Sequence, residues 1–145
     1  MIVKLDQRLY EKMLAQAKEE FPNECCGLVA GESGEDIIEV KEVFPMTNLD
    51  ASAEHFSMDP KEQFAVVKEI RCLGYDLLGN YHSHPFTPSR PSYEDKRLAY
   101  DEGAIYFILS LKKRDEPVLN AFKIKGRSEV TKLEVKIVEG GEFNE

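Results

Sequence analysis

The sequence predicts a mixed α/β fold in which a mostly antiparallel sheet is flanked by helices. Two segments, residues 6–21 and 59–73, carry apolar side chains at helical spacing, and each begins at an aspartate that can cap a helix. Several short apolar or alternating runs are typical of strands. Most of these runs follow one another across short polar turns, which favours antiparallel pairs.

Each of the two helices is marked by its first residue, its apolar stripe and its end. Behind Asp6 the stripe comprises Leu9, Met13, Leu14, Ala17 and Phe21, and Pro22-Asn23 ends the helix. The second helix starts at Asp59-Pro60-Lys61-Glu62, where a cap, a proline and an acid occupy their preferred positions, and Gly74 ends it. We expect one helix on each side of the sheet.

The strands are expected at residues 25–30, 36–44, 75–82, 104–111, 119–124 and 130–138. The segment 104–111 is nearly all apolar, which indicates a central strand buried on both faces. A further helix is predicted from Ser92 to about Glu102, with Leu98 and Ala99 facing inward. The tail from Gly140 is expected to fray.

Length and composition predict one domain, residues 1–145, with a single core. A net charge of −8 argues against a nucleic-acid partner, and no apolar run approaches a membrane span. The first residues, Met1 to Leu5, are too short and too soon polar for a signal peptide, so a cytoplasmic location is expected. The three cysteines imply no disulfide framework, although a bridge from Cys25 or Cys26 to Cys72 stays open. The oligomeric state and the role of these cysteines are left open.

The segment from Gly79 to Asp95 holds two of the three histidines of the chain. His82 and His84 lie one residue apart, so a strand places both imidazoles on one face. Three prolines then turn the chain back, and Asp95 can return on the first turn of the next helix. Two imidazoles and a carboxylate form a three-ligand zinc site with a fourth position left for water, which is typical of catalytic zinc. Ser92-x-x-Asp95 also matches a helix-capping pattern, and capping can coexist with ligation.

The pattern His-x-His, seven residues, Ser, two residues, Asp resembles the JAMM (MPN-plus) metalloprotease family, which pairs it with an upstream glutamate such as Glu24. The likeness covers nearly the whole chain, because helices and strands come in the family's order. It implies an MPN architecture related to that of cytidine deaminases. It also implies that His82, His84 and Asp95 hold zinc, that Glu24 acts as general base, and that Ser92 supports the oxyanion.

The resemblance also implies a substrate. Eukaryotic members cut ubiquitin isopeptide bonds and carry insertions that grip ubiquitin, for which residues 45–59 leave little room. The chain looks more like the compact prokaryotic branch, which is linked to ubiquitin-like sulfur carriers. The expected activity is hydrolysis of an amide or isopeptide bond after the C-terminal Gly-Gly of such a carrier, because a Gly-Gly end suits a narrow groove.

Other interpretations stay open at this point. An acid at the mouth of an apolar strand, such as Glu24, is commonly a solvated end residue. Residues 45–57 are a substrate-facing loop or a plain connector, and His55 is left out of the ligand set. Three other functions are a non-catalytic MPN-type scaffold, a cysteine peptidase using Cys25 or Cys26, and a zinc nucleobase deaminase. The deaminase lacks its Pro-Cys-x-x-Cys signature here.

Overall fold

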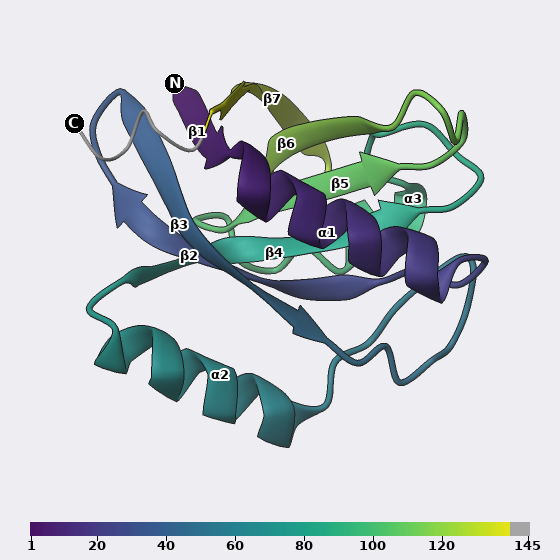
Figure 1. The fold of residues 1–145 in the computed structure, drawn as a ribbon, viewed down its shortest axis with the longest axis horizontal. Coiled ribbons are helices and arrows are strands. Elements are labelled where there is room, and N and C mark those ends of the chain that lie inside the picture. The colour runs from purple at the N-terminus through teal and green to yellow at the C-terminus, as the bar shows by residue number, and fades with distance from the viewer. Residues whose placement is uncertain (140–145) are drawn as a thin grey trace.

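The computed structural model describes residues 1–139, in which seven strands close into a barrel with helices packed against it (Figure 1). The sequence-predicted tail from Gly140 lies outside the described residues. The strands are β1 (Ile2–Asp6), β2 (Cys26–Ser33), β3 (Ile37–Met46), β4 (Asp76–His84), β5 (Ile105–Ser110), β6 (Val118–Lys125) and β7 (Glu129–Val138). The helices are α1 (Gln7–Glu20), α2 (Pro60–Cys72) and α3 (Tyr93–Arg97).

The α/β class is confirmed, and the sheet is closed rather than open. Its order is β1-β3-β2-β4-β5-β6-β7, with β7 returning to β1. The pairs β2–β3, β2–β4, β5–β6 and β6–β7 are antiparallel, whereas β1–β3, β1–β7 and β4–β5 are parallel. The sequence did not reveal β1, whose five residues pair in parallel with two strands far away in the chain. Such a strand forms because its partners are in place, since strand formation depends strongly on context.

The two long helices are confirmed, together with their caps. The Asp6 carboxylate accepts a hydrogen bond from the Arg8 N–H at 2.8 Å, and Asp59 accepts one from the Lys61 N–H at 3.1 Å. In Figure 1, α1 crosses the front of the barrel and α2 lies below it, on the side of β2 and β3. No helix within residues 1–139 combines the length and the apolar character needed to cross a membrane.

Side chains along β2 alternate between two separate apolar clusters. Cys25, just before the strand, and Val29 pack in the main core with Leu9, Met13 and Ala17 of α1. Cys26 and Leu28 point the other way, to a smaller cluster with Val66 and Val67 of α2. All three cysteines are free, so the bridge to Cys72 that the sequence left open is absent. This alternation sets the face on which the predicted ligands lie, because Cys26 is directly opposite His82.

The helix predicted from Ser92 to about Glu102 is wrong in its length, because α3 ends at Arg97. Leu98 is the C-cap residue and is 44% exposed, contrary to its predicted inward position, whereas Ala99 is buried as predicted. The chain leaves the helix because Asp101 builds a turn of its own: its side chain accepts the Gly103 N–H at 2.9 Å and its carbonyl accepts the Ala104 N–H. Aspartate commonly competes with helix hydrogen bonds in this way.

Replacing Gly79 by alanine is expected to destabilise the fold by about 1–3 kcal/mol or more, as overpacked sites do. Gly79 lies on β4 directly opposite Ile105, and an added Cβ would come within 1.9 Å of the Ile105 carbonyl oxygen. Neither strand can move away without opening the barrel. Urea denaturation measures the effect. Gly103→Ala is the matched control, since its nearest neighbour is the Asp101 side chain at 3.3 Å, and an equal loss in both variants would contradict the explanation.

Candidate metal centre

Strand β4 carries the two histidines at its carboxyl end, between β2 and β5. His82 and His84 are 2% and 3% exposed, and the period of two places them on the same face. Ser83 points the opposite way, and its hydroxyl oxygen accepts the Cys25 N–H at 2.8 Å. The Ser83 N–H in turn donates to the Cys25 carbonyl, so the segment around Glu24 is tied to the histidine strand.

Asp95 completes a triangle of three atoms with the two imidazoles. His82 Nε2 and His84 Nε2 lie 3.1 Å apart, and Asp95 Oδ2 lies 3.2 Å and 3.0 Å from them. Ligands of a tetrahedral zinc ion at 2.0–2.1 Å are separated by roughly 3.3 Å. The triangle therefore has nearly the size of one face of a zinc coordination tetrahedron, and these three residues form a cluster able to hold a metal.

Neighbouring groups orient the two imidazoles toward the cluster. His84 Nδ1 lies 2.9 Å from the Pro88 carbonyl oxygen, which can only accept, so Nδ1 donates to it and Nε2 faces the cluster. The ring of Phe56 stacks on His82 with centroids 4.7 Å apart. His82 Nδ1 is buried and has no hydrogen-bond partner within residues 1–139. Phe56 and Pro88 are contributions that the sequence analysis missed, because neither belongs to a ligand motif.

The Asp95 carboxylate is charged in this arrangement. Burial by itself would raise the pKa of Asp95, but hydrogen bonds from both histidines and from the Ser92 N–H outweigh it and hold the pKa well below its usual range. An ionised carboxylate beside two imidazoles supplies the donor set that zinc prefers. The residues present thus fit the metal that the motif implies.

Ser92 occupies the N-cap position of α3 and forms both halves of a capping box. Its hydroxyl oxygen accepts the Asp95 N–H at 3.0 Å, and its own N–H donates to Asp95 Oδ2 at 2.9 Å. The capping interpretation of Ser92-x-x-Asp95 is therefore confirmed. Because Ser92 is exposed and its hydroxyl uses only a lone pair here, the hydroxyl proton remains available to another acceptor.

Glu24 lies just before β2 and is buried, 3% exposed, rather than solvated as an end residue would be. Its N–H donates to the Ser52 carbonyl at 2.7 Å, and its carbonyl accepts the Asn48 side-chain N–H at 3.0 Å. Glu24 Oε1 has no hydrogen-bond partner among the described residues. Burial raises the pKa of Glu24 to about 9, and the negative charge of Asp95 adds to the effect.

Metal-free Glu24→Gln is expected to be more stable than metal-free wild type, by a margin that grows with pH. The Glu24 pKa is about 9 in the folded protein against a usual 4.5. Between these values the folded chain keeps a proton that the unfolded chain has released, so the wild type loses stability as pH rises. Glutamine has no such proton. Thermal denaturation in chelator at about pH 5 and about pH 9 measures the margin, and a pH-independent difference would contradict the expectation.

A pocket of about 220 Å³ opens beside the cluster. Leu28, Phe56, Met58 and Leu98 give it apolar walls, and Asn80 and Gln63 add amide groups. His55 also lines it and bonds to Asp50 at 2.9 Å, outside the metal cluster, which agrees with leaving it out of the ligand set. Residues 45–57 therefore contribute to the wall of the site, through His55 and Phe56, rather than forming a plain connector.

The chain is similar in sequence and in structure to known proteins. Residues 6–125 match the family described as prokaryotic homologs of the JAB domain. The chain is 31% identical to the CysO-cysteine peptidase of Mycobacterium tuberculosis, over 96% of this chain and 92% of that protein. It is 33% identical to the desampylase of Haloferax volcanii, over 69% and 74% of the two chains. It is also similar to the solved structure of DSY2949 from Desulfitobacterium hafniense, with a TM-score of 0.86 and 47% identity over 96% and 94% of the two chains.

The match spans α1 and the strands β2 to β6, and it includes every predicted site residue, from Glu24 to Asp95. One of the two relatives is named as a peptidase, and it aligns with nearly the full chain. Motif, fold and relatives agree: the chain belongs to the prokaryotic JAB-domain family, the compact prokaryotic branch of the JAMM/MPN proteins.

Proposed function

We propose that this chain is a zinc-dependent peptidase or isopeptidase that hydrolyses the amide bond after the C-terminal Gly-Gly of a ubiquitin-like or sulfur-carrier protein. The observation that carries the proposal is the triangle of His82, His84 and Asp95, with edges of 3.0–3.2 Å, beside the buried acid Glu24. The substrate class is supported by similarity to the CysO-cysteine peptidase and to the desampylase. The particular carrier is set by surfaces outside this triangle.

In this proposal His82, His84 and Asp95 hold the metal and Glu24 moves the protons. A zinc ion bound there would supply a Lewis acid for the scissile carbonyl and would lower the pKa of a water molecule to about 7. The positive charge of a metal bound in the triangle would favour the ionised form of Glu24, which would then take the proton of the attacking water and return it to the leaving amine. Its buried carboxylate lacks a fixed hydrogen-bond partner within residues 1–139, so it is free to exchange a proton.

Ser92 and the pocket are given roles in binding and orientation. The Ser92 hydroxyl accepts from the Asp95 N–H, which fixes its position, while its proton can donate to the oxyanion that develops on the carbonyl oxygen. The apolar walls of the neighbouring pocket, together with Asn80, would receive the substrate tail and exclude water. A tail of two glycines brings no side chain that would clash with His82 or Leu28.

Two alternatives fit less well. A cysteine peptidase would need a thiolate, but burial raises the pKa of both Cys25 and Cys26 to about 12. Cys25 also faces the main core, away from the histidines. A non-catalytic scaffold would not need the compact set of His82, His84 and Asp95 with an acid buried beside it.

The test uses the purified full-length protein loaded with zinc and a carrier protein fused through its C-terminal Gly-Gly to a reporter amine. Mass spectrometry should find cleavage directly after Gly-Gly, abolished by chelator and unaffected by a thiol-alkylating reagent. Loss of activity with the thiol reagent alone would favour the cysteine mechanism. If peptides are cleaved but no carrier conjugate is, the substrate class is refuted and the peptidase assignment survives.

We further propose that residues 1–145 act as one domain, which the pairing of the first strand β1 with the last described strand β7 supports. The cytoplasmic location and the absence of a nucleic-acid partner remain predictions from the sequence.

A further inference from the structure

A second groove, of about 400 Å³, lies between α3 and the turn that joins β6 to β7. Its lining residues are Tyr93, Lys96, Arg97, Gly126, Arg127 and Ser128. We propose that this groove docks an acidic patch on the folded body of the carrier protein whose tail enters the metal centre. The inference rests on the proposed function and adds to it the surface that recognises the substrate and the charge that this substrate must carry.

The groove is lined by basic side chains. The chain carries 27 acidic and 19 basic side chains, yet three cations line this one groove. Within residues 1–139, Lys96 and Arg127 make no ion pair, and Arg97 pairs only with exposed Glu94 at 3.3 Å, a contact worth little in water. The Glu102 carboxylate accepts the Gly126 N–H at 2.8 Å and keeps its negative charge beside this turn. Three cations against these two acids, Glu94 and Glu102, leave the groove with a net positive charge.

Arg127 has a backbone conformation that arginine seldom adopts. The turn has Gly126 at φ 61° and Arg127 at φ 56°, the two left-handed positions of a tight hairpin turn, where asparagine, aspartate or glycine is preferred. An arginine there costs roughly 1 kcal/mol. Its guanidinium lies 5.3 Å from the centre of the Tyr100 ring. A strained position that keeps a long cationic side chain is explained if that side chain is used.

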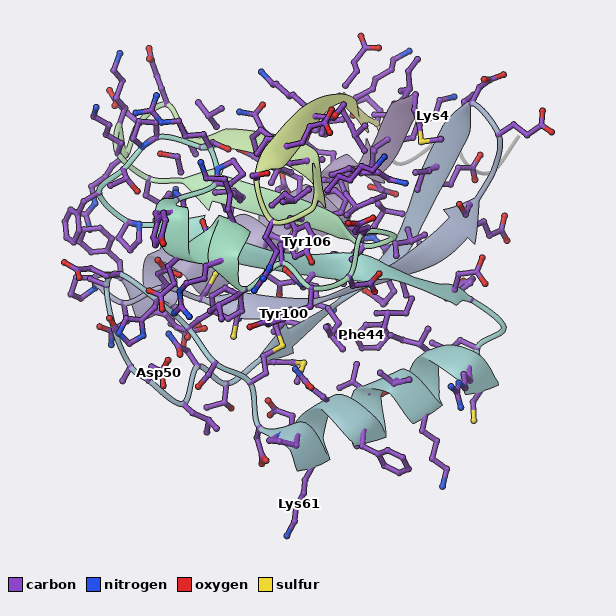
Figure 2. The ribbon with its side chains drawn as sticks, turned by 180° about the vertical axis from the view of Figure 1, so that it is seen from behind. Lys4, Phe44, Asp50, Lys61, Tyr100 and Tyr106 are labelled. Carbon is purple, nitrogen blue, oxygen red and sulfur yellow. The ribbon has the colours of Figure 1, made fainter. Side chains whose placement is uncertain are left out.

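Exposed aromatic side chains lie around these cations. Tyr93 and Tyr100 are 80% and 70% exposed. Tyrosine and arginine are enriched among the residues that carry binding energy at protein interfaces. Figure 2, which shows the molecule from behind, places Tyr100 near the middle of this side. Exposed rings beside these cations favour a folded protein partner. A nucleic acid would need many more cations and would be repelled by the net charge of −8.

The groove lies close to the metal cluster, because α3 contributes to both. Helix α3 has only five residues, about 7.5 Å in length, and it supplies the ligand Asp95 toward the histidines and Lys96 and Arg97 to the groove. A body seated in the groove would therefore have its tail within a few residues of the metal centre. Binding in the groove raises the local concentration of the tail at the site, which lowers KM and leaves the chemical step alone.

The test compares two substrates on the zinc-loaded full-length protein: an acidic carrier protein fused through Gly-Gly to a reporter, and a short peptide with the same junction. The variant Lys96→Glu/Arg127→Glu should raise KM for the carrier fusion at least about tenfold with kcat within about twofold, so that the ratio of kcat/KM between the two substrates falls about tenfold. Raising salt from about 50 mM to about 500 mM should reproduce the shift in wild type. Lys61→Glu/Lys68→Glu, with the same charge change on exposed positions of α2, is the matched control.

A second variant separates docking from folding. Arg127→Asn removes the charge and suits the left-handed turn, so it should raise KM for the carrier fusion while the melting temperature holds or rises. Equal KM shifts in the groove and α2 variants would overturn the proposal, because they would report only the overall charge. Loss of peptide cleavage to the same degree would also overturn it, as would a groove that binds a short RNA and not the carrier.

The proposed function fails separately, if the wild type cleaves neither substrate. Docking is then still measured as the Kd of the intact carrier fusion with the Glu24→Gln protein. The groove proposal requires that Lys96→Glu/Arg127→Glu weaken this Kd by about tenfold relative to the α2 control variant.

Discussion

Replacing Glu24 by glutamine is expected to lower kcat on a Gly-Gly conjugate by about 10²–10⁴-fold, the range for loss of a general acid–base group. Glutamine has the same shape, so it fits the buried site before β2, but it cannot accept the proton of the attacking water. Zinc content should stay at the wild-type level, because the ligand triangle does not include Glu24. Steady-state kinetics and metal analysis on the same preparation measure both quantities.

Glu54→Gln is the matched control for this variant. Glu54 is exposed, and its negative charge also raises the pKa of Glu24. The Glu54→Gln substitution therefore removes a charge near Glu24 without removing the base. Its kcat should remain within about threefold of wild type. Turnover by Glu24→Gln at the rate of this control would remove Glu24 from the mechanism.

Replacing Asp95 by asparagine is expected to abolish both zinc binding and turnover. Altering a group that merely supports a metal ligand typically costs 10–100-fold in affinity, so exchanging the ligand itself should weaken zinc by more than about 100-fold. The amide keeps an oxygen that can accept the Ser92 N–H, so the cap of α3 survives while the negative charge is lost. Metal analysis and the zinc-induced rise in melting temperature measure the loss, since zinc stabilises only a protein that binds it.

Glu94→Gln provides the comparison for Asp95→Asn, since it neutralises the adjacent residue of the same helix. Glu94 pairs with Arg97 at the surface and lies outside the ligand triangle, so this variant should keep its zinc. An Asp95→Asn protein with full zinc content, or equal loss of zinc in both variants, would show that Asp95 is not a ligand.

Local chemistry made much of the fold and of the candidate site predictable. Asp6 and Asp59 mark helix starts because a side-chain oxygen two residues before a free N–H satisfies it wherever the helix lies. His82 and His84 share a face because a strand repeats every two residues. The missed strand β1 and the overextended α3 had other causes: β1 depends on partners distant in sequence, and the turn at Asp101 competes with the helix.

The sequence by itself determined which atoms are available: two imidazoles one residue apart, a capping serine followed by an aspartate, and an acid before an apolar strand. Only the tertiary structure decided how those atoms meet. The pairing of Cys26 with His82 brings the neighbourhood of Glu24 to the histidine strand, and β1 closes the barrel between β3 and β7. Spacing along the chain controls short-range geometry through backbone sterics and hydrogen bonds. Contacts between distant residues, such as Cys26 with His82 and Cys25 with Ser83, form because burying the two apolar faces of β2 leaves one register for its neighbours.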